Sequence, residues 1–210
     1  MHMIKNYILS IIIGTITILM VWSIWNFKIS ERQKEVLQLD FDKTQKDWMF
    51  YRKLEMESEQ IHLDSHIALT KDAIEDTVSL SELINKSPKL IIRYSNINWG
   101  MCNSSDFINI ENLVKIFGGE NIILITAPSR LEDLFTFKEI NNINIPVYQL
   151  YENRLSIPLE KENIPFLFVT DKLFYTNFIL IPDPSMPSIL EQYVDIIHNR
   201  FFSSKADSRI

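Results

Sequence analysis

The chain has 210 residues, of which 46% are hydrophobic and 23% charged, which is typical of a globular protein and excludes a largely disordered one. Its net charge of -6 disfavours a nucleic-acid-binding protein, because contacts to phosphate groups need a concentrated positive surface. One cysteine cannot form a disulfide within the chain, and the four glycines do not make a glycine-rich phosphate loop.

The first predicted element is an apolar helix over residues 7–25, which contain no charged residue. A helix of this length spans roughly 28 Å, close to the thickness of a bilayer's hydrocarbon core. Tyr7 lies at one end, and Trp22 and Trp25 lie at the other, as interfacial anchors do. We therefore expect residues 1–26 to be a transmembrane anchor, with residues 7–25 in contact with the membrane. A cleaved signal peptide is the alternative, although the apolar run is long and ends in bulky residues.

Residues 27–62 are predicted to form a helical stalk. The segment has no glycine or proline and is rich in glutamate, lysine, glutamine and leucine, which favour helices. Its apolar residues follow a helical spacing but do not sustain a heptad repeat. A solvated stalk is therefore favoured over a dimeric coiled coil, and the mixed charges are interpreted as its solvated face.

The remaining residues, 63–210, are predicted to form one globular domain. Continuous apolar runs indicate buried strands, and apolar residues at helical spacing indicate helices. The order is strand, helix, strand, helix, strand, then a hairpin and a final helix. The predicted elements are strands at 66–70, 77–80, 89–94, 121–126 and 146–150, helices at 107–117 and 131–140, a hairpin of 165–170 and 175–180, and a helix at 185–201.

This order is that of the thioredoxin arrangement. The region from about 63 to 202 resembles the redoxin and thiol-disulfide oxidoreductase branch of the thioredoxin-like families, as found on bacterial membrane anchors. The resemblance depends on this order of elements and on the sequences of residues 77–83 and 88–95. The resemblance implies an α/β fold with a central mixed sheet flanked by helices, preceded here by the anchor and the stalk. Residues 164–166, Ile-Pro-Phe, resemble the family's cis-proline loop, which implies a cis peptide bond before Pro165 facing the active turn.

The active turn departs from the family. Where the family carries Cys-x-x-Cys, this chain has Trp99, Gly100, Met101 and Cys102, so a tryptophan occupies the position of the attacking cysteine. Dithiol exchange needs both sulfur atoms, and the resemblance therefore implies a degenerate motif. We interpret Cys102 as a packing residue behind the indole. Peroxiredoxins, which share the fold, carry Pro-x-x-x-Thr-x-x-Cys, and Ser95 and Trp99 do not match the proline and threonine of that motif.

The resemblance also implies a groove that holds extended peptide by backbone pairing and apolar contact. We expect a non-catalytic binding or accessory module in the bacterial envelope, with a protein or peptide partner. The alternative is a monothiol oxidoreductase in which Cys102 is the catalytic residue and forms mixed disulfides. The expected partner-binding residues are Trp99, Gly100, Met101, Ile164 and Pro165.

The side of the membrane is predicted from two opposing observations. Lys5 precedes the apolar segment, whereas Lys28, Arg32 and Lys34 follow it, and this distribution favours a cytoplasmic domain. Anchored members of the resembled family project into the periplasm. Because the difference in flanking charge is small, we give the resemblance more weight and expect a single-pass inner-membrane protein with a periplasmic domain. A cytoplasmic domain is the alternative.

No cofactor, metal or nucleic-acid site is predicted. His62 and His66 are four residues apart and would share a helix face, but His66 is expected to open a strand and no third ligand is near. The charged run 160–162 is interpreted as a solvated loop. Asp183 lies between two prolines and is interpreted as a turn residue rather than half of an acid–base pair.

Overall fold

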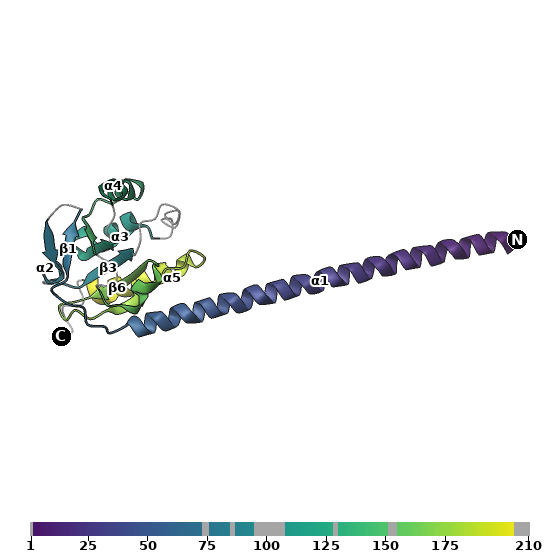
Figure 1. Cartoon of the computed structure of the whole chain (residues 1–210), viewed down its shortest axis with the longest axis horizontal. Helices are drawn as coiled ribbons and strands as arrows, with labels where there is room; N and C mark the ends of the chain where they lie inside the picture. The colour runs from purple at the N-terminus through teal and green to yellow at the C-terminus, as the bar shows by residue number, and fades with distance from the viewer. Residues whose placement is uncertain are drawn as a thin grey trace. The chain divides into compact units, whose positions relative to one another are not determined.

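The computed structural model describes residues 2–72, 76–84, 87–94, 108–127, 130–150 and 155–203, with the backbone alone for residues 2–13 and 18 (Figure 1). The chain divides into two compact units, Met1–Phe50 and Tyr51–Ile210. The predicted boundary between stalk and domain was residue 63, so the second unit begins upstream of it. The reason is that the last turns of the long helix bury side chains, Leu54 among them, in the core of the second unit.

Helix α1 (His2–Ser58) runs through the first unit and into the second. Residues 27–58 are helical, as the absence of glycine and proline predicts, and the helix ends four residues before the predicted end of the stalk. Within the part of the helix whose side chains are described, no stretch is both long enough and apolar enough to cross a bilayer. Residues 7–13 of the predicted anchor, and residue 18, lie outside those described side chains.

The described residues of the second unit form a seven-stranded mixed sheet with the strand order β2-β1-β5-β4-β3-β6-β7. Strand β3 pairs parallel with β4, and β4 pairs parallel with β5, while β3 pairs antiparallel with β6. The strands are β1 (Ala68–Lys71), β2 (Thr77–Ser79), β3 (Lys89–Tyr94), β4 (Ile122–Thr126), β5 (Val147–Gln149), β6 (Phe166–Thr170) and β7 (Asn177–Leu180).

Helices connect the parallel strands, because parallel neighbours need a crossover. Helix α3 (Ile110–Phe117) joins β3 to β4, and α4 (Leu131–Ile140) joins β4 to β5. The hairpin of β6 and β7 follows, and α5 (Pro187–Ile197) ends the fold. This order confirms the predicted α/β arrangement of a mixed sheet flanked by helices.

The ends of α3 show how the local sequence sets an element. The side chain of Asn109 accepts a hydrogen bond from the backbone N–H of Asn112 at 2.9 Å and so caps the first turn. The helix ends at Gly118, whose φ of 81° lies in the left-handed region that glycine adopts without strain. The helix predicted at 107–117 thus ends at the predicted residue, Phe117.

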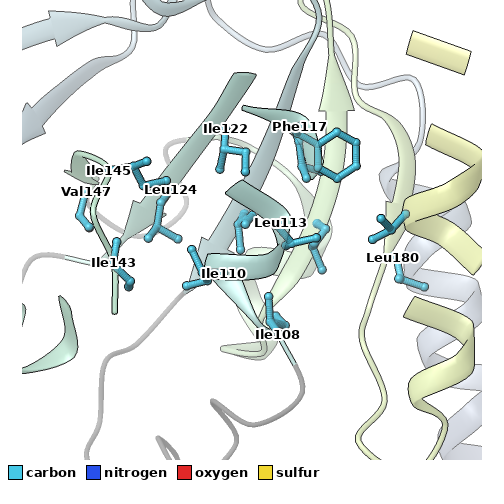
Figure 2. Close-up of a cluster of buried hydrophobic side chains, with 14 of the residues drawn as sticks. Ile108, Ile110, Leu113, Phe117, Ile122, Leu124, Ile143, Ile145, Val147 and Leu180 are labelled. Carbon is cyan, nitrogen blue, oxygen red and sulfur yellow. The ribbon is translucent and has the colours of Figure 1, made fainter. Parts of the chain in front are cut away.

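Both faces of the sheet are buried. On one face, side chains of α3, α4 and α5 pack on the sheet, and Figure 2 shows Ile110, Leu113 and Phe117 of α3 near Ile122 and Leu124 of β4. The other face is covered by the end of α1, by the short helix α2 (Leu80–Leu83) and by the 3-10 helix η3 (Pro158–Glu162). Because successive strand residues point to opposite faces, both sets must be apolar, which explains the continuous apolar runs of the central strands.

Candidate functional site

The candidate site lies at the carboxyl end of β3, where open α/β sheets commonly hold their ligands. The chain leaves the sheet there at Tyr94 and enters the segment that contains the predicted active turn. Four of the predicted site residues lie outside the described residues, so the site is described here without them. These residues are Trp99, Gly100, Met101 and Cys102.

The other two predicted residues, Ile164 and Pro165, directly precede β6 and are half-buried. Strand β6 runs antiparallel to β3, and its first residue, Phe166, pairs with Arg93. Continuing this register by one residue places Pro165 opposite Tyr94. The structure thus brings Pro165, from a distant part of the sequence, to the end of β3, five residues before Trp99.

The peptide bond before Pro165 is trans, because no peptide bond between described residues is cis. The predicted cis proline is therefore wrong. A proline sequence alone does not decide this point, because the trans form of an X–Pro bond is favoured by only about 0.5–1 kcal/mol and the surrounding fold selects the isomer.

A buried ion pair lies beside this edge. Arg93 in β3 and Glu160 in η3 have side chains that are 0% and 1% exposed, and the Nε of Arg93 donates to Oε1 of Glu160 at 2.9 Å. The backbone N–H of Leu155 donates to Oε2 of the same carboxylate at 3.1 Å. Arg93 also donates through Nη1 to the carbonyl of Tyr94 at 3.3 Å. The pair therefore ties the end of β3 to the segment that leads to Pro165.

The burial of Glu160 corrects the interpretation of residues 160–162 as a solvated run. Lys161 and Glu162 are exposed as predicted, but Glu160 is 2% exposed. One signal in the sequence could have indicated a buried charge: Arg93 directly follows the apolar residues 90–92, and it shares a sheet face with the buried Ile91. A charge on a buried face needs a counter-charge. The sequence offers no comparable signal for which carboxylate supplies it.

The opposite face of the sheet at this edge is largely apolar. The ring of Tyr94 meets the ring of Phe137 edge-on, with centroids 5.4 Å apart. The hydroxyl of Thr126, at the end of β4, is buried and has no hydrogen-bond partner in the described part of the chain. On the same face as Arg93, by contrast, burial and, secondarily, the negative charge of Asp72 raise the pKa of the Tyr148 phenol in β5.

The described polar groups at this edge already make structural contacts. The carboxylate of Glu160 accepts from Arg93 and from the backbone N–H of Leu155. Across the described ranges, no three His, Cys, Asp or Glu side chains gather as metal ligands do. His62 instead packs edge-on against Tyr175, with ring centroids 5.1 Å apart.

No family model and no curated protein matches the chain. Among solved structures, the peroxidoxin BcpB from Mycobacterium tuberculosis is 12% identical, with a TM-score of 0.50 over 67% of this chain and 97% of that chain. The mitochondrial 2-Cys peroxiredoxin from Plasmodium falciparum is 17% identical, with a TM-score of 0.47 over 67% and 95% of the two chains. A thiol:disulfide interchange protein from Chlorobium tepidum TLS is 13% identical, with a TM-score of 0.45 over 64% and 94%. The likeness to the peroxidoxin, at 12% identity, shows the fold and not the activity: the second unit has the thioredoxin-like fold.

Proposed function

We propose that this chain is a membrane-anchored protein whose thioredoxin-like domain binds an extended polypeptide without performing dithiol chemistry. The observation that carries the proposal is the register of β3 and β6, which sets Pro165 opposite Tyr94, five residues before Trp99. Residues 99–101 would form one wall of the peptide groove, and Ile164 and Pro165 would form the other. The proposed module serves as an accessory component of the bacterial envelope.

The side chains proposed for the groove suit an apolar peptide. Tryptophan and methionine supply large contact areas, and aromatic anchors commonly dominate the energetics of such interfaces. An extended peptide adds main-chain hydrogen bonds to these contacts. The absence of a second cysteine supports a non-catalytic role, because a mixed disulfide formed in this groove would have no second thiol in the chain to release it.

A binding experiment tests this proposal. The full-length protein is exposed to an immobilised library of ten-residue peptides rich in apolar residues, and affinities are measured for the peptides that bind. Trp99→Ala and Pro165→Ala are each expected to weaken binding about tenfold or more, the typical effect of removing an interface anchor. A library in which no peptide binds would contradict the proposal.

Pro146→Ala is the matched control for Pro165→Ala. Pro146 is also half-buried and also directly precedes a strand. Strand β5 runs in the same direction as β4 and β3, whereas β6 runs antiparallel to β3, so the starts of β5 and β6, where the two prolines lie, are at opposite ends of the sheet's strands. Equal losses of affinity in both variants, or no loss in the Pro165 and Trp99 variants, would contradict the proposed groove.

We also propose that residues 7–25 cross the inner membrane once and that the domain lies in the periplasm. The support is the uncharged apolar run with aromatic residues at its ends. Alkaline phosphatase fused after Ile210 is expected to be active in a bacterial host, because that enzyme needs the oxidising periplasm to form its disulfides. A β-galactosidase fusion at the same position is expected to be inactive. The reverse pattern would place the domain in the cytoplasm.

A monothiol oxidoreductase is the second candidate function. The observation in its favour is that the one cysteine of the chain falls at the position that the resembled family uses for its second active-site sulfur. In this mechanism the Cys102 thiolate attacks a partner disulfide, one partner sulfur leaves as a thiolate, and an external thiol must later release the mixed disulfide. Reactivity of Cys102 in the folded protein separates the two candidates.

A further inference from the structure

Helix α4 carries apolar side chains that the core does not use. Leu134 and Phe137 pack on the sheet and are buried, whereas Leu131 is 46% exposed and Phe135 is 57% exposed. Residues four apart lie on one face of a helix, so the two exposed side chains are neighbours. The solvent face of a surface helix is normally polar, and this one therefore has more apolar area than the fold requires.

Two carboxylates border this apolar pair. Glu132 precedes Phe135 by three residues and Glu139 follows it by four, so all three share one side of the helix. Both glutamates are exposed, and neither carboxylate has an ion-pair or hydrogen-bond partner in the described part of the chain. The remaining charged side chains of α4 and its N-cap form ion pairs, which are Arg130 with Asp133 and Lys138 with Asp72. The apolar pair is thus bordered by two negative charges that nothing described neutralises.

This side of α4 lies within reach of the proposed peptide groove. The backbone N–H of Ala127, directly after β4, donates to the carbonyl of Tyr94 at 3.1 Å. Leu131 follows Ala127 by four residues, and four residues of chain span at most about 14 Å. A ten-residue extended peptide is about 33 Å long, so one that passes Pro165 and Tyr94 is long enough to contact α4 as well.

The α4 face is made up of four exposed residues, Leu131, Glu132, Phe135 and Glu139. We propose that the α4 face binds part of the peptide that occupies the groove and selects peptides with lysine or arginine beside an apolar residue. A basic side chain there would neutralise the carboxylates, and its charge would also be attracted to the ring of Phe135. The inference rests on the proposed function and adds the class of peptide, which is cationic rather than neutral or acidic.

Charge complementarity sets the size of the expected preference. Each exposed ion pair is expected to strengthen binding about threefold, so two pairs strengthen it about tenfold. Because exposed pairs are screened by ions, the preference should shrink in 1 M salt, where the Debye length is about 3 Å. The net charge of the chain, -6, attracts a cationic peptide as well, and a control for this long-range effect is therefore needed.

Matched peptides test the inference with the full-length protein. Apolar ten-residue peptides are made in three versions that carry two lysines, two glutamines or two glutamates at either end, and fluorescence anisotropy measures their affinities. The lysine version is expected to bind about tenfold more tightly than the glutamine version, and the glutamate version more weakly than both. If all three versions bind equally, the peptide groove stands but selection by the α4 face is overturned. If no version binds, both proposals are overturned.

A double variant assigns the preference to α4. Glu132→Gln with Glu139→Gln removes both charges and is expected to bring the affinities of the lysine and glutamine versions to within about twofold. Glu191→Gln with Asp195→Asn, at two exposed residues of α5, changes the net charge by the same amount and should leave the preference intact. Equal losses of preference in the two double variants would reveal an effect of net charge alone and would overturn the assignment.

Phe135→Ala tests the apolar part of the α4 face. The variant is expected to bind all three peptide versions about fivefold or more weakly, because the contact area of the ring is lost. Ile140→Ala is the matched control, since Ile140 is also 57% exposed but lies about 140° away around the helix. Equal losses of affinity in these two variants, or no loss in Phe135→Ala, would overturn the role of the α4 face.

Discussion

Replacing Glu160 with alanine is expected to lower the free energy of unfolding of the domain by about 3–5 kcal/mol. The guanidinium of Arg93 is fully buried, and without the carboxylate its charge would lose its counter-ion inside the protein. The backbone N–H of Leu155 would lose its acceptor as well. Chemical denaturation of the full-length protein, followed by near-ultraviolet circular dichroism, measures the loss as a shift of the midpoint.

Two further variants separate the buried charge from the general effect of truncation. The double variant Arg93→Met, Glu160→Leu removes both charges, and it is expected to be more stable than Glu160→Ala because no unpaired charge remains. Glu111→Ala breaks an exposed ion pair with Lys115 at 2.6 Å and should change the stability by no more than about 0.5 kcal/mol. A double variant that is less stable than the single one would contradict the role assigned to the pair.

Cys102 is expected to react with a maleimide at least about tenfold more slowly in the folded protein than in the urea-unfolded protein. A packing residue reacts only when the structure opens, and each 1.4 kcal/mol of opening free energy reduces the reactive population tenfold. Because Cys102 is the one thiol in the chain, the labelling rate measured at neutral pH reports on it directly. A small thiol under the same conditions provides the reference rate.

Trp99→Ala is the informative variant for this measurement. If the indole shields the sulfur, its removal should speed labelling of the folded protein toward the rate in urea, while Trp48→Ala on α1 should leave it unchanged. Labelling of the wild-type protein faster than the reference thiol would instead favour the monothiol oxidoreductase.

The predicted elements match the structure closely. The strand predicted at 89–94 is observed as Lys89–Tyr94, and the helix predicted at 131–140 is observed as Leu131–Ile140. Both are set by the local spacing of apolar residues, which a single sequence displays directly. The order of such elements, with helices between the strands, also favoured the thioredoxin-like arrangement that the structure has.

The candidate site was predictable only in part. A strand that leads into a turn is visible in the sequence, and so is a proline before a later strand. Their proximity depends on the pairing of β3 with β6, which joins residues far apart in the chain. The isomer of the Pro165 peptide bond was predicted wrongly because the energies of the two forms are close and the fold decides between them.

By itself, the sequence determined which segments are strands and helices, that most of the stalk is helical, and that no dithiol pair exists. Each of these properties depends on residue type or on neighbouring residues along the chain. Only the tertiary structure decided that Glu160 neutralises Arg93 and that Glu55 and Glu59 accept hydrogen bonds from the backbone at β7. In the sequence these carboxylates resemble solvated charges. Their partners come from distant segments, and burial, which makes such pairing necessary, is a property of the folded chain.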